Sequence, residues 1–426
     1  MHILKIIHGY PPTYNAGSEV YSQSICNQLK KTNKISVFTR EENLYLPDFK
    51  IRQQKKDNID FFFANMARAK DGFCHLELDK KFSKIIEKIK PDVAHIGHLN
   101  HLSTGFIEIL KEKKIPIIFT LHDFWLMCPR GQFLQVNFGN DKIHQLCDGQ
   151  EDRKCATNCY RQYATGLPFY TNYNINEWKE WVQTRMNETR YIAQKIDIFI
   201  APSQYLRNRF IKDFQIPEQK IIYLDYGFPL SYLQPIEKKQ RDFYTFGYIG
   251  THIPAKGVNI LIEAFQKLPQ EKVKLKIFGR ENGQSTQYLK EISEGFNIEF
   301  CGEYINQNLA KVVFSEVDCI VVPSIWAENS PLVIHEAQAC KIPVITTDFG
   351  GMAEYVQHLE NGLLFEHRNT KDLTEKMLFA SENKNLMNEL GKKGYLYSEN
   401  GEVPNIENHC QILEKIYQKI IQNYGI

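Results

Sequence analysis

The sequence predicts an α/β protein made of two doubly wound domains, each a parallel sheet covered by helices. Short apolar runs alternate with helical patterns along nearly the whole chain. Such continuous apolar runs are typical of parallel strands that are buried on both faces of a sheet. The pattern is interrupted by the polar stretch Pro229–Arg241 and then resumes. A chain of 426 residues is long enough for two or three domains, each with its own core.

In the first half of the chain, apolar runs are predicted to be strands and the segments between them to be helices. The expected strands are Ile3–His8, Ile35–Thr39, Asp60–Ala64, Val93–Ile96, Ile115–Thr120 and Ile198–Ala201. Apolar residues recur at helical spacing in Ser18–Leu29 and Lys80–Ile89. These elements form the first predicted domain, residues 1–230, which carries a cysteine-rich insertion at 126–162.

The second half repeats the alternation of strand and helix. Its expected strands are Tyr244–Gly250, Val273–Gly279, Ile298–Cys301, Cys319–Pro323 and Val344–Thr346. They define a second domain at 241–400. A last helix is predicted after Pro404, because apolar residues from Ile412 to Ile421 fall on one stripe at helical spacing. We expect this segment, 404–426, to pack back toward the first domain.

Composition and charge narrow the classes of function. The net charge of +2 argues against nucleic acid as a partner, and no apolar run approaches the roughly 20 residues that span a bilayer. The opening run Met1–His8 is too short for a signal peptide. We therefore expect a cytoplasmic protein, in which the ten cysteines are mostly reduced thiols.

The segment Trp326–Cys340 combines a loop carboxylate with the start of a helix. Ser330 is a good N-cap and Pro331 suits the first helical position. Glu328 precedes the predicted helix, and Glu336 lies about 7.5 Å along its axis from Pro331, at about 1.5 Å per residue. The free N–H groups of the first turn can bind a pyrophosphate. Chance also places two glutamates eight residues apart in many chains, so the neighbouring motifs decide the interpretation.

Other polar motifs follow predicted strands, where ligands bind in open α/β sheets. Gly17 opens a helix after the first strand, His122 and Asp123 follow the fifth, and Lys256 follows the first strand of the second domain. A glycine lets the backbone approach a ligand closely, and a lysine supplies positive charge for phosphate. Each of these features also occurs without any ligand, so their number and order carry the argument.

Together these residues resemble the retaining nucleotide-sugar glycosyltransferases of family four. The matching motifs stand in the family's order over nearly the whole chain: Gly17–Glu19, His122–Asp123, Ala201–Ser203, Lys256–Gly257, Glu328–Glu336 and Gly350–Gly351. The two glutamates around Asn329–Leu332 are the specific element. The resemblance implies the GT-B fold, with two Rossmann-like domains facing a cleft, the acceptor on the first and the nucleotide sugar on the second. The stretch Leu121–Cys159 looks like a bacterial polysaccharide-assembly subgroup.

The resemblance also implies a role for each matching residue. Glu328 would contact the donor sugar, Glu336 the ribose hydroxyls, and Lys256 the diphosphate leaving group. His122 would contact the sugar or position reacting groups, and Gly17 would lie by the phosphates or the acceptor. The expected catalytic residues are thus Glu328, His122 and Lys256. The expected donor-binding residues are Glu336, Gly17, His252, Arg280, Asn329, Ser330, Pro331 and Leu332.

The sequence departs from the family pattern in one place. The family commonly has an arginine a few residues before the phosphate lysine, and Thr251–His252 occupy that turn here. A guanidinium binds phosphate through two hydrogen bonds, which an ammonium does not. Either His252 or Arg280 compensates, or the activity is weaker or altered.

The expected reaction is retaining transfer of a hexose from a UDP- or GDP-sugar to a hydroxyl of a saccharide or lipid-linked acceptor. It would serve cell-surface polysaccharide synthesis and need no metal or other cofactor for its chemistry. Two alternatives stay open, a nucleotide-sugar epimerase or hydrolase and a non-catalytic sugar-nucleotide-binding protein. Aromatic residues in 160–190 and a lysine-rich helix face at 80–90 also fit contact with the inner face of a membrane. Local packing and solvation explain the same residues.

Four of the ten cysteines lie close together in the insertion: Cys128, Cys147, Cys155 and Cys159. Their spacing does not match the paired C-x2-C knuckles of a common zinc ribbon. A small subdomain with little core nevertheless needs an additional stabilising cross-link. Structural zinc, free thiols or disulfides, and an iron–sulfur cluster are the interpretations left open. Three clustered histidines lack the accompanying ligand pattern of a metal site: His95, His98 and His101.

Overall fold

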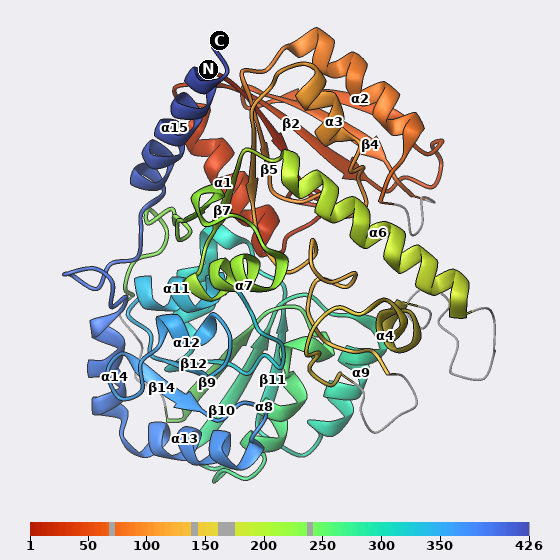
Figure 1. Ribbon diagram of the computed structural model, residues 1–426. Coiled ribbons are helices and arrows are strands. Elements are labelled where there is room, and N and C mark those ends of the chain that lie inside the picture. Colours follow the sequence, from red (N-terminus) through yellow and green to blue (C-terminus); the bar gives the residue numbers. More distant parts are fainter. Residues whose placement is uncertain (68–72, 138–143, 161–174, 237–241, 426) are drawn as a thin grey trace. The chain divides into compact units, whose positions relative to one another are not determined.

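The computed structural model describes residues 1–67, 73–137, 144–160, 175–236 and 242–425. The chain divides into two compact units, of which the first contains Met1–Gly227 and Ile406–Ile426 and the second Phe228–Asn405. Each unit is built on one mostly parallel sheet with helices beside it (Figure 1). The cleft expected between the two domains stays a prediction.

The first unit contains an eight-stranded sheet with the order β3-β4-β2-β1-β5-β6-β7-β8. Its strands are β1 (His2–Ile6), β2 (Lys34–Glu41), β3 (Ile51–Lys56), β4 (Ile59–Asn65), β5 (Val93–Ile96), β6 (Ile117–Thr120), β7 (Ile198–Ala201) and β8 (Ile221–Tyr223). The prediction of strands at Val93–Ile96 and Ile198–Ala201 is confirmed to the residue. The expectation of a purely parallel sheet is wrong at one edge, where β3 pairs antiparallel with β4. Because β3 is an edge strand of exposed polar residues, it has no apolar run that would predict it.

Seven α-helices are described in the first unit: α1 (Gly17–Leu29), α2 (Leu76–Ile89), α3 (Phe106–Glu112), α4 (Asp152–Cys155), α6 (Ile175–Lys195), α7 (Gln204–Phe214) and α15 (Ile406–Asn423). The C-terminal helix α15 lies against α1 (Figure 1). Buried hydrogen bonds of two tyrosine–histidine pairs join this helix to the rest of the unit. Tyr21 Oη and His409 Nε2 are 2.7 Å apart, and Tyr417 Oη and His95 Nδ1 are 2.6 Å apart. His95 is therefore a structural residue of the core.

The second unit contains a six-stranded, wholly parallel sheet with the order β11-β10-β9-β12-β13-β14. Its strands are β9 (Tyr244–Ile249), β10 (Val273–Phe278), β11 (Ile298–Gly302), β12 (Cys319–Val322), β13 (Val344–Thr347) and β14 (Gly362–Phe365). Its described α-helices are α8 (Val258–Phe265), α9 (Gly283–Ile292), α10 (Leu309–Val312), α11 (Leu332–Ala339), α12 (Met352–Tyr355), α13 (Thr370–Glu382) and α14 (Lys384–Lys393). The buried core is formed mainly by aliphatic and aromatic side chains of β9, β10, α8 and α13.

The strand order reverses once in each sheet. In the first sheet, β2, β3 and β4 lie on one side of β1, and β5 to β8 lie on the other. In the second, β10 and β11 lie on one side of β9, and β12 to β14 lie on the other. Loops that leave the carboxyl ends of neighbouring strands diverge at such a point, which leaves room for a ligand. The two switch points are thus β1/β5 and β9/β12.

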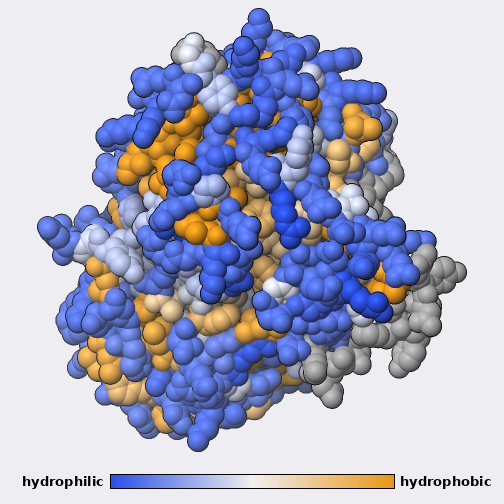
Figure 2. Space-filling view, in the orientation of Figure 1, coloured by the Kyte–Doolittle hydropathy of each residue, from blue (hydrophilic) through white to orange (hydrophobic). Residues whose placement is uncertain are grey.

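The described part of the chain contains no helix that is both long and apolar enough to cross a membrane. The face drawn in Figure 2 carries hydrophobic residues in patches among hydrophilic ones. Of the aromatic residues expected near the insertion, Phe169, Tyr170 and Tyr173 lie outside the described residues. Trp178 and Trp181 pack beside the small core of α4 and α6, as the interpretation of local packing expects.

Candidate functional site

In the second unit, an ion pair lies at the β9/β12 switch point. Lys256 follows β9 and Glu328 follows β12, and Lys256 Nζ lies 2.5 Å from Glu328 Oε1. Ser324 Oγ donates a second hydrogen bond to the same oxygen, at 2.7 Å. Glu328 is buried, whereas the Lys256 side chain keeps 29% of its surface exposed. Both of these contacts are made to Oε1, and no described residue donates to Glu328 Oε2.

Glycines allow three loops to meet around this pair. A Cβ at Gly257 would lie 2.0 Å from the carbonyl oxygen of Pro323, and Gly257 has a positive φ of 67°. A Cβ at Gly351 would lie 1.5 Å from the carbonyl oxygen of Asn329, and Gly351 N–H donates to Glu328 O at 2.7 Å. The loops after β9, β12 and β13 therefore approach more closely than side chains would permit.

The predicted start of the α11 helix is corrected by one residue. Pro331 is the N-cap, with extended backbone angles, and Leu332 is the first helical residue. The Ser330 N–H donates to the side-chain carbonyl of Asn329. N–H groups in the first turn of a helix can bind an anion. The predicted position of Glu336 on the helix is retained.

Glu336 is a half-buried carboxyl for which no described residue provides a hydrogen bond. Burial raises its pKa to about 7, and His335 acts in the opposite direction. Tyr232 and Tyr304 are close enough for the Glu336 charge to help raise the pKa of each phenol. A carboxyl group beside two phenols provides both a hydrogen-bond acceptor and aromatic surface, which suits a nucleoside.

The structure places the two proposed substitutes for the missing arginine differently. His252 is fully buried, with Nδ1 3.2 Å from Thr286 Oγ1, and burial lowers its pKa. A buried neutral imidazole does not supply the charge of a guanidinium. Arg280 follows β10 and is exposed, and its carbonyl accepts the His252 N–H at 3.0 Å. Of the two, only Arg280 presents a cation to solvent.

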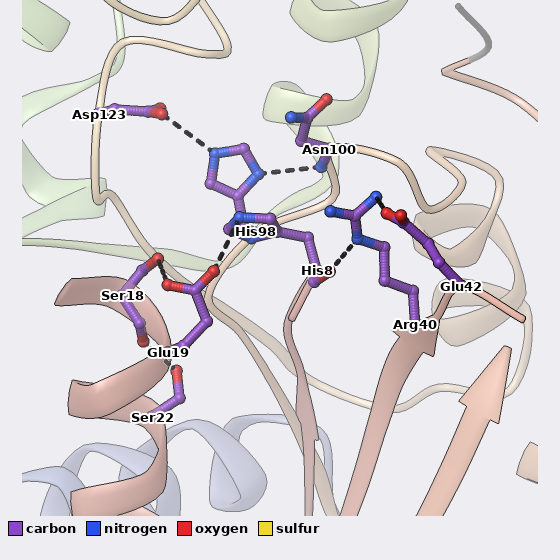
Figure 3. A network of polar contacts seen from close by, with 9 residues as sticks. All are labelled: His8, Ser18, Glu19, Ser22, Arg40, Glu42, His98, Asn100 and Asp123. Carbon is purple, nitrogen blue, oxygen red and sulfur yellow. Dashed lines mark hydrogen bonds and ion pairs between the residues drawn. The ribbon is translucent and has the colours of Figure 1, made fainter. Parts of the chain in front are cut away.

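In the first unit, a polar network lies at the β1/β5 switch point (Figure 3). His98, which follows β5, accepts the Asn100 N–H at Nδ1 over 2.9 Å. Its Nε2 is therefore the protonated nitrogen, and it lies 3.3 Å from Asp123 Oδ2. Trp125 N–H donates to the other oxygen, Asp123 Oδ1, at 2.7 Å. The Asp123 side chain keeps 30% of its surface exposed, so a fixed carboxylate is presented to solvent.

A second part of this network lies beside His98. His8, which follows β1, has Nε2 3.3 Å from Glu19 Oε1, and Ser18 Oγ donates to Glu19 Oε2 at 2.8 Å. The His8 and His98 rings are 4.4 Å apart. Arg40 Nε donates to the His8 carbonyl at 2.7 Å (Figure 3). Burial and the neighbouring basic groups hold the pKa of His8 well below its usual range, so His8 is neutral.

The other predicted residues of the first unit lie close to this network. His122 follows β6, is half-buried, and has Nδ1 2.6 Å from Tyr226 Oη. Burial lowers its pKa well below the usual value. Gly17 is the exposed first residue of α1, whose start has no side-chain cap. His122 is thus a neutral, oriented imidazole, and Gly17 marks an open helix N-terminus.

Several of these residues escape prediction from the sequence. His8, Tyr232 and Tyr304 belong to no predicted motif, and His98 stands out in the sequence only as part of a histidine cluster. The signal that could have found Tyr304 is its position just past a strand, at the edge where the other motifs lie. His101, the last of the clustered histidines, has a positive φ of 58° and forms no part of the network in Figure 3.

The fold and both switch points define a two-domain α/β protein with polar side chains gathered at the carboxyl edges of its sheets. Family models identify it further. The model described as "Glycosyltransferase Family 4" matches residues 16–231, just over half of the chain, and "Glycosyl transferases group 1" matches residues 233–397. The chain therefore belongs to the family-four glycosyltransferases.

Relatives of this chain match over part of their length. An uncharacterized glycosyltransferase of Methanocaldococcus jannaschii is 30% identical over 213 residues, which are 49% of this chain and 56% of the relative. The capsular polysaccharide biosynthesis glycosyltransferase CapM of Staphylococcus aureus is 26% identical over 232 residues, 49% of this chain and 60% of the relative. The chain thus spans little more than half the length of these curated relatives.

Solved structures match over the whole chain. Sucrose-phosphate synthase from Thermosynechococcus elongatus has a TM-score of 0.72 at 16% identity, and the match covers 99% of both chains. Anabaena HepE, solved in complex with UDP and glucose, has a TM-score of 0.67 at 16% identity, covering 98% of this chain and 99% of that one. At such identity the likeness shows the fold alone, and it confirms the predicted GT-B class.

Proposed function

We propose that this protein transfers a hexose from a nucleotide sugar to a hydroxyl of a saccharide or lipid-linked saccharide, with retention at the anomeric carbon. The observation that carries the proposal is the Lys256–Glu328 pair at the β9/β12 switch point, with Glu336 one helix turn beyond the start of α11. A ligand with a sugar, a diphosphate and a ribose has matching partners there in that order.

Each part of the donor has a candidate partner in the second unit. Glu328 Oε2 would accept a hydrogen bond from a sugar hydroxyl. Lys256 and the first N–H groups of α11 would stabilise the negative charge that develops on the leaving diphosphate. Glu336 would accept hydrogen bonds from the ribose diol, and Arg280 would supply part of the charge of the missing arginine. Structural neighbours solved with UDP or UDP-glucose support a donor of this chemical class.

The acceptor hydroxyl would be bound in the first unit, where Asp123 presents a fixed carboxylate. Asp123 would orient the hydroxyl, and His122 would contact the sugar. In a retaining reaction without a protein nucleophile, the leaving phosphate takes the proton of the hydroxyl that attacks from the same face. The protein then supplies orientation and fixed charges, and no metal is required for this chemistry. The CapM relative, a capsular polysaccharide biosynthesis glycosyltransferase, supports an acceptor from polysaccharide assembly.

Donor consumption with and without acceptor tests this function. Thermal-shift measurements with UDP-, GDP- and ADP-sugars would first select the donor, and short saccharides with a lipid-linked saccharide would serve as acceptors. A transferase consumes the donor only when acceptor is present. Epimerised or hydrolysed donor in the absence of acceptor would instead establish the epimerase or hydrolase alternative.

A further inference from the structure

Four cysteines of the first unit line one small cavity: Cys128, Cys147, Cys155 and Cys159. The cavity has a volume of about 10 Å³, which is room for one small occupant. Cys128, Cys155 and Cys159 are buried and Cys147 is half-buried, and all four are free thiols. Cysteines separated by up to 31 positions in the sequence thus converge on a single void.

The local fold explains this convergence. A bridge between Leu134 and Leu146 pairs the two sides of the loop, and Cys147 N–H donates to Phe133 O at 2.7 Å. Cys155 ends α4, and Cys159 lies in the single π-helical turn that continues it, Ala156–Tyr160. Glu151 caps the start of this helix by accepting from the N–H groups of Arg153 and Lys154. The helical segment thus contributes Cys155 and Cys159, Cys147 follows the Leu134–Leu146 bridge, and Cys128 lies in the turn before it.

One side of this cysteine group packs against α6. Cys155 and Ala156 form a small buried cluster with Val182 and Met186 of that helix. Lys154 and Arg130 are close enough to act electrostatically on these thiols.

We propose that these four cysteines bind one Zn²⁺ ion in a closed, tetrahedral structural site. Four thiols would form four Zn–S bonds of about 2.3 Å and release up to four protons, with no change in oxidation state. Among the described residues, no three His, Cys, Asp or Glu side chains are already arranged to hold a metal ion. Binding therefore includes a rotation of the thiols into the cavity they line. Lys154 and Arg130 would offset part of the charge of the tetrathiolate.

The metal would hold the insertion against the loop that carries Asp123. Gly131 lies between Cys128 and this loop, where a Cβ would be 3.0 Å from Asp123 Oδ2. Phe124 N–H also donates to Gly131 O at 3.0 Å. The zinc site is independent of the proposed transfer reaction, because it concerns the stability of this subdomain.

Metal analysis of the full chain tests the proposal. Protein expressed with zinc in the medium and purified without chelator or metal-affinity resin should contain about one zinc per chain. Cys147→Ser should lose most of this zinc, whereas Cys301→Ser, a half-buried cysteine of the second unit, should keep it. Co²⁺ in place of zinc should give the visible absorption of a tetrahedral tetrathiolate.

A second measurement covers the case in which Cys147→Ser does not fold. Titration of the wild type with an organomercurial should release zinc in step with modification of the four thiols. Zinc below about 0.2 per chain, with no uptake by the reduced protein, would overturn the proposal. So would a disulfide among the four cysteines in the protein as purified, or iron with inorganic sulfide in place of zinc.

Discussion

Lys256 and Glu328, 72 positions apart in the chain, form an ion pair with Nζ 2.5 Å from Oε1. The pair joins the loops of the two strands at which the second sheet reverses its order. Both charges are held in place before a ligand is present, which lowers the cost of organising them during the reaction.

Lys256→Ala should lower kcat/KM for transfer by about 10²- to 10³-fold, because it removes a fixed positive charge from the leaving diphosphate. Lys267→Ala, at an exposed lysine of the same unit, is the matched control and should retain wild-type rates. Steady-state kinetics together with circular dichroism would check both variants. A folded Lys256→Ala enzyme with wild-type kinetics would remove Lys256 from the site.

Donor binding should depend on pH through Glu336, whose pKa is about 7. The carboxylate accepts hydrogen bonds from the ribose, so UDP-glucose, which has no titrating phosphate in this range, should bind about tenfold more tightly at pH 8 than at pH 6. Glu336→Gln should bind more weakly and with little pH dependence. Calorimetric titration at the two pH values measures this, with Glu263→Gln as control. Parallel pH profiles for wild type and Glu336→Gln would contradict the assignment.

The Glu336 carboxyl should also make the free energy of unfolding depend on pH. This free energy should fall as pH rises, whereas donor affinity should increase. Its pKa is higher in the folded chain than the value of 4.5 of a free glutamate. The folded state therefore binds more protons between these values, and the contribution of Glu336 to stability falls as pH rises from about 4.5 through 7. Glu336→Gln should abolish this part of the loss, as urea unfolding at pH 5 and pH 8 would show. An equal loss in both proteins would exclude Glu336 as the cause.

Asp123→Asn should raise the KM for acceptor and lower kcat, while the affinity for donor stays unchanged. The reason is that Asp123 lies in the first unit, held by His98 and by the Trp125 N–H. His98→Asn should give a weaker form of the same effect, since His98 positions Asp123. Asp60→Asn, at a half-buried aspartate on β4, serves as control. A loss of donor affinity in Asp123→Asn would argue against an acceptor role.

The buried Lys5 should make the free energy of unfolding rise with pH in the alkaline range. It is fully buried on β1, no described residue gives it a hydrogen bond or ion pair, and burial lowers its pKa to about 7. The unfolded chain therefore binds more protons between about pH 7 and 10.5, and stability rises with pH across this range. Lys5→Met should add on the order of 2 kcal/mol at pH 6 and less at pH 9. Chemical denaturation measures this; Lys34→Met, on the exposed start of β2, should change little.

The sequence predicts the sheets well because parallel strands buried on both faces leave continuous apolar runs. It does not predict β3, whose polar side chains face solvent, or the one-residue shift at the start of α11, where Pro331 has extended backbone angles. Lys256 and Glu328 could be proposed because each follows a strand of the predicted sheet. The His98–Asp123 contact could not, because it depends on the side-chain orientation that the Asn100 N–H imposes.

The central claim, that the β9/β12 switch point of the second unit binds a nucleotide sugar, is tested most directly by calorimetric titration with UDP-glucose and GDP-mannose. At least one should bind the wild type and the Lys267→Ala control with similar affinity, and should bind Lys256→Ala and Glu336→Ala at least about tenfold more weakly. Binding that both of these variants retain unchanged, or no binding of either nucleotide sugar to the wild type, would contradict the account.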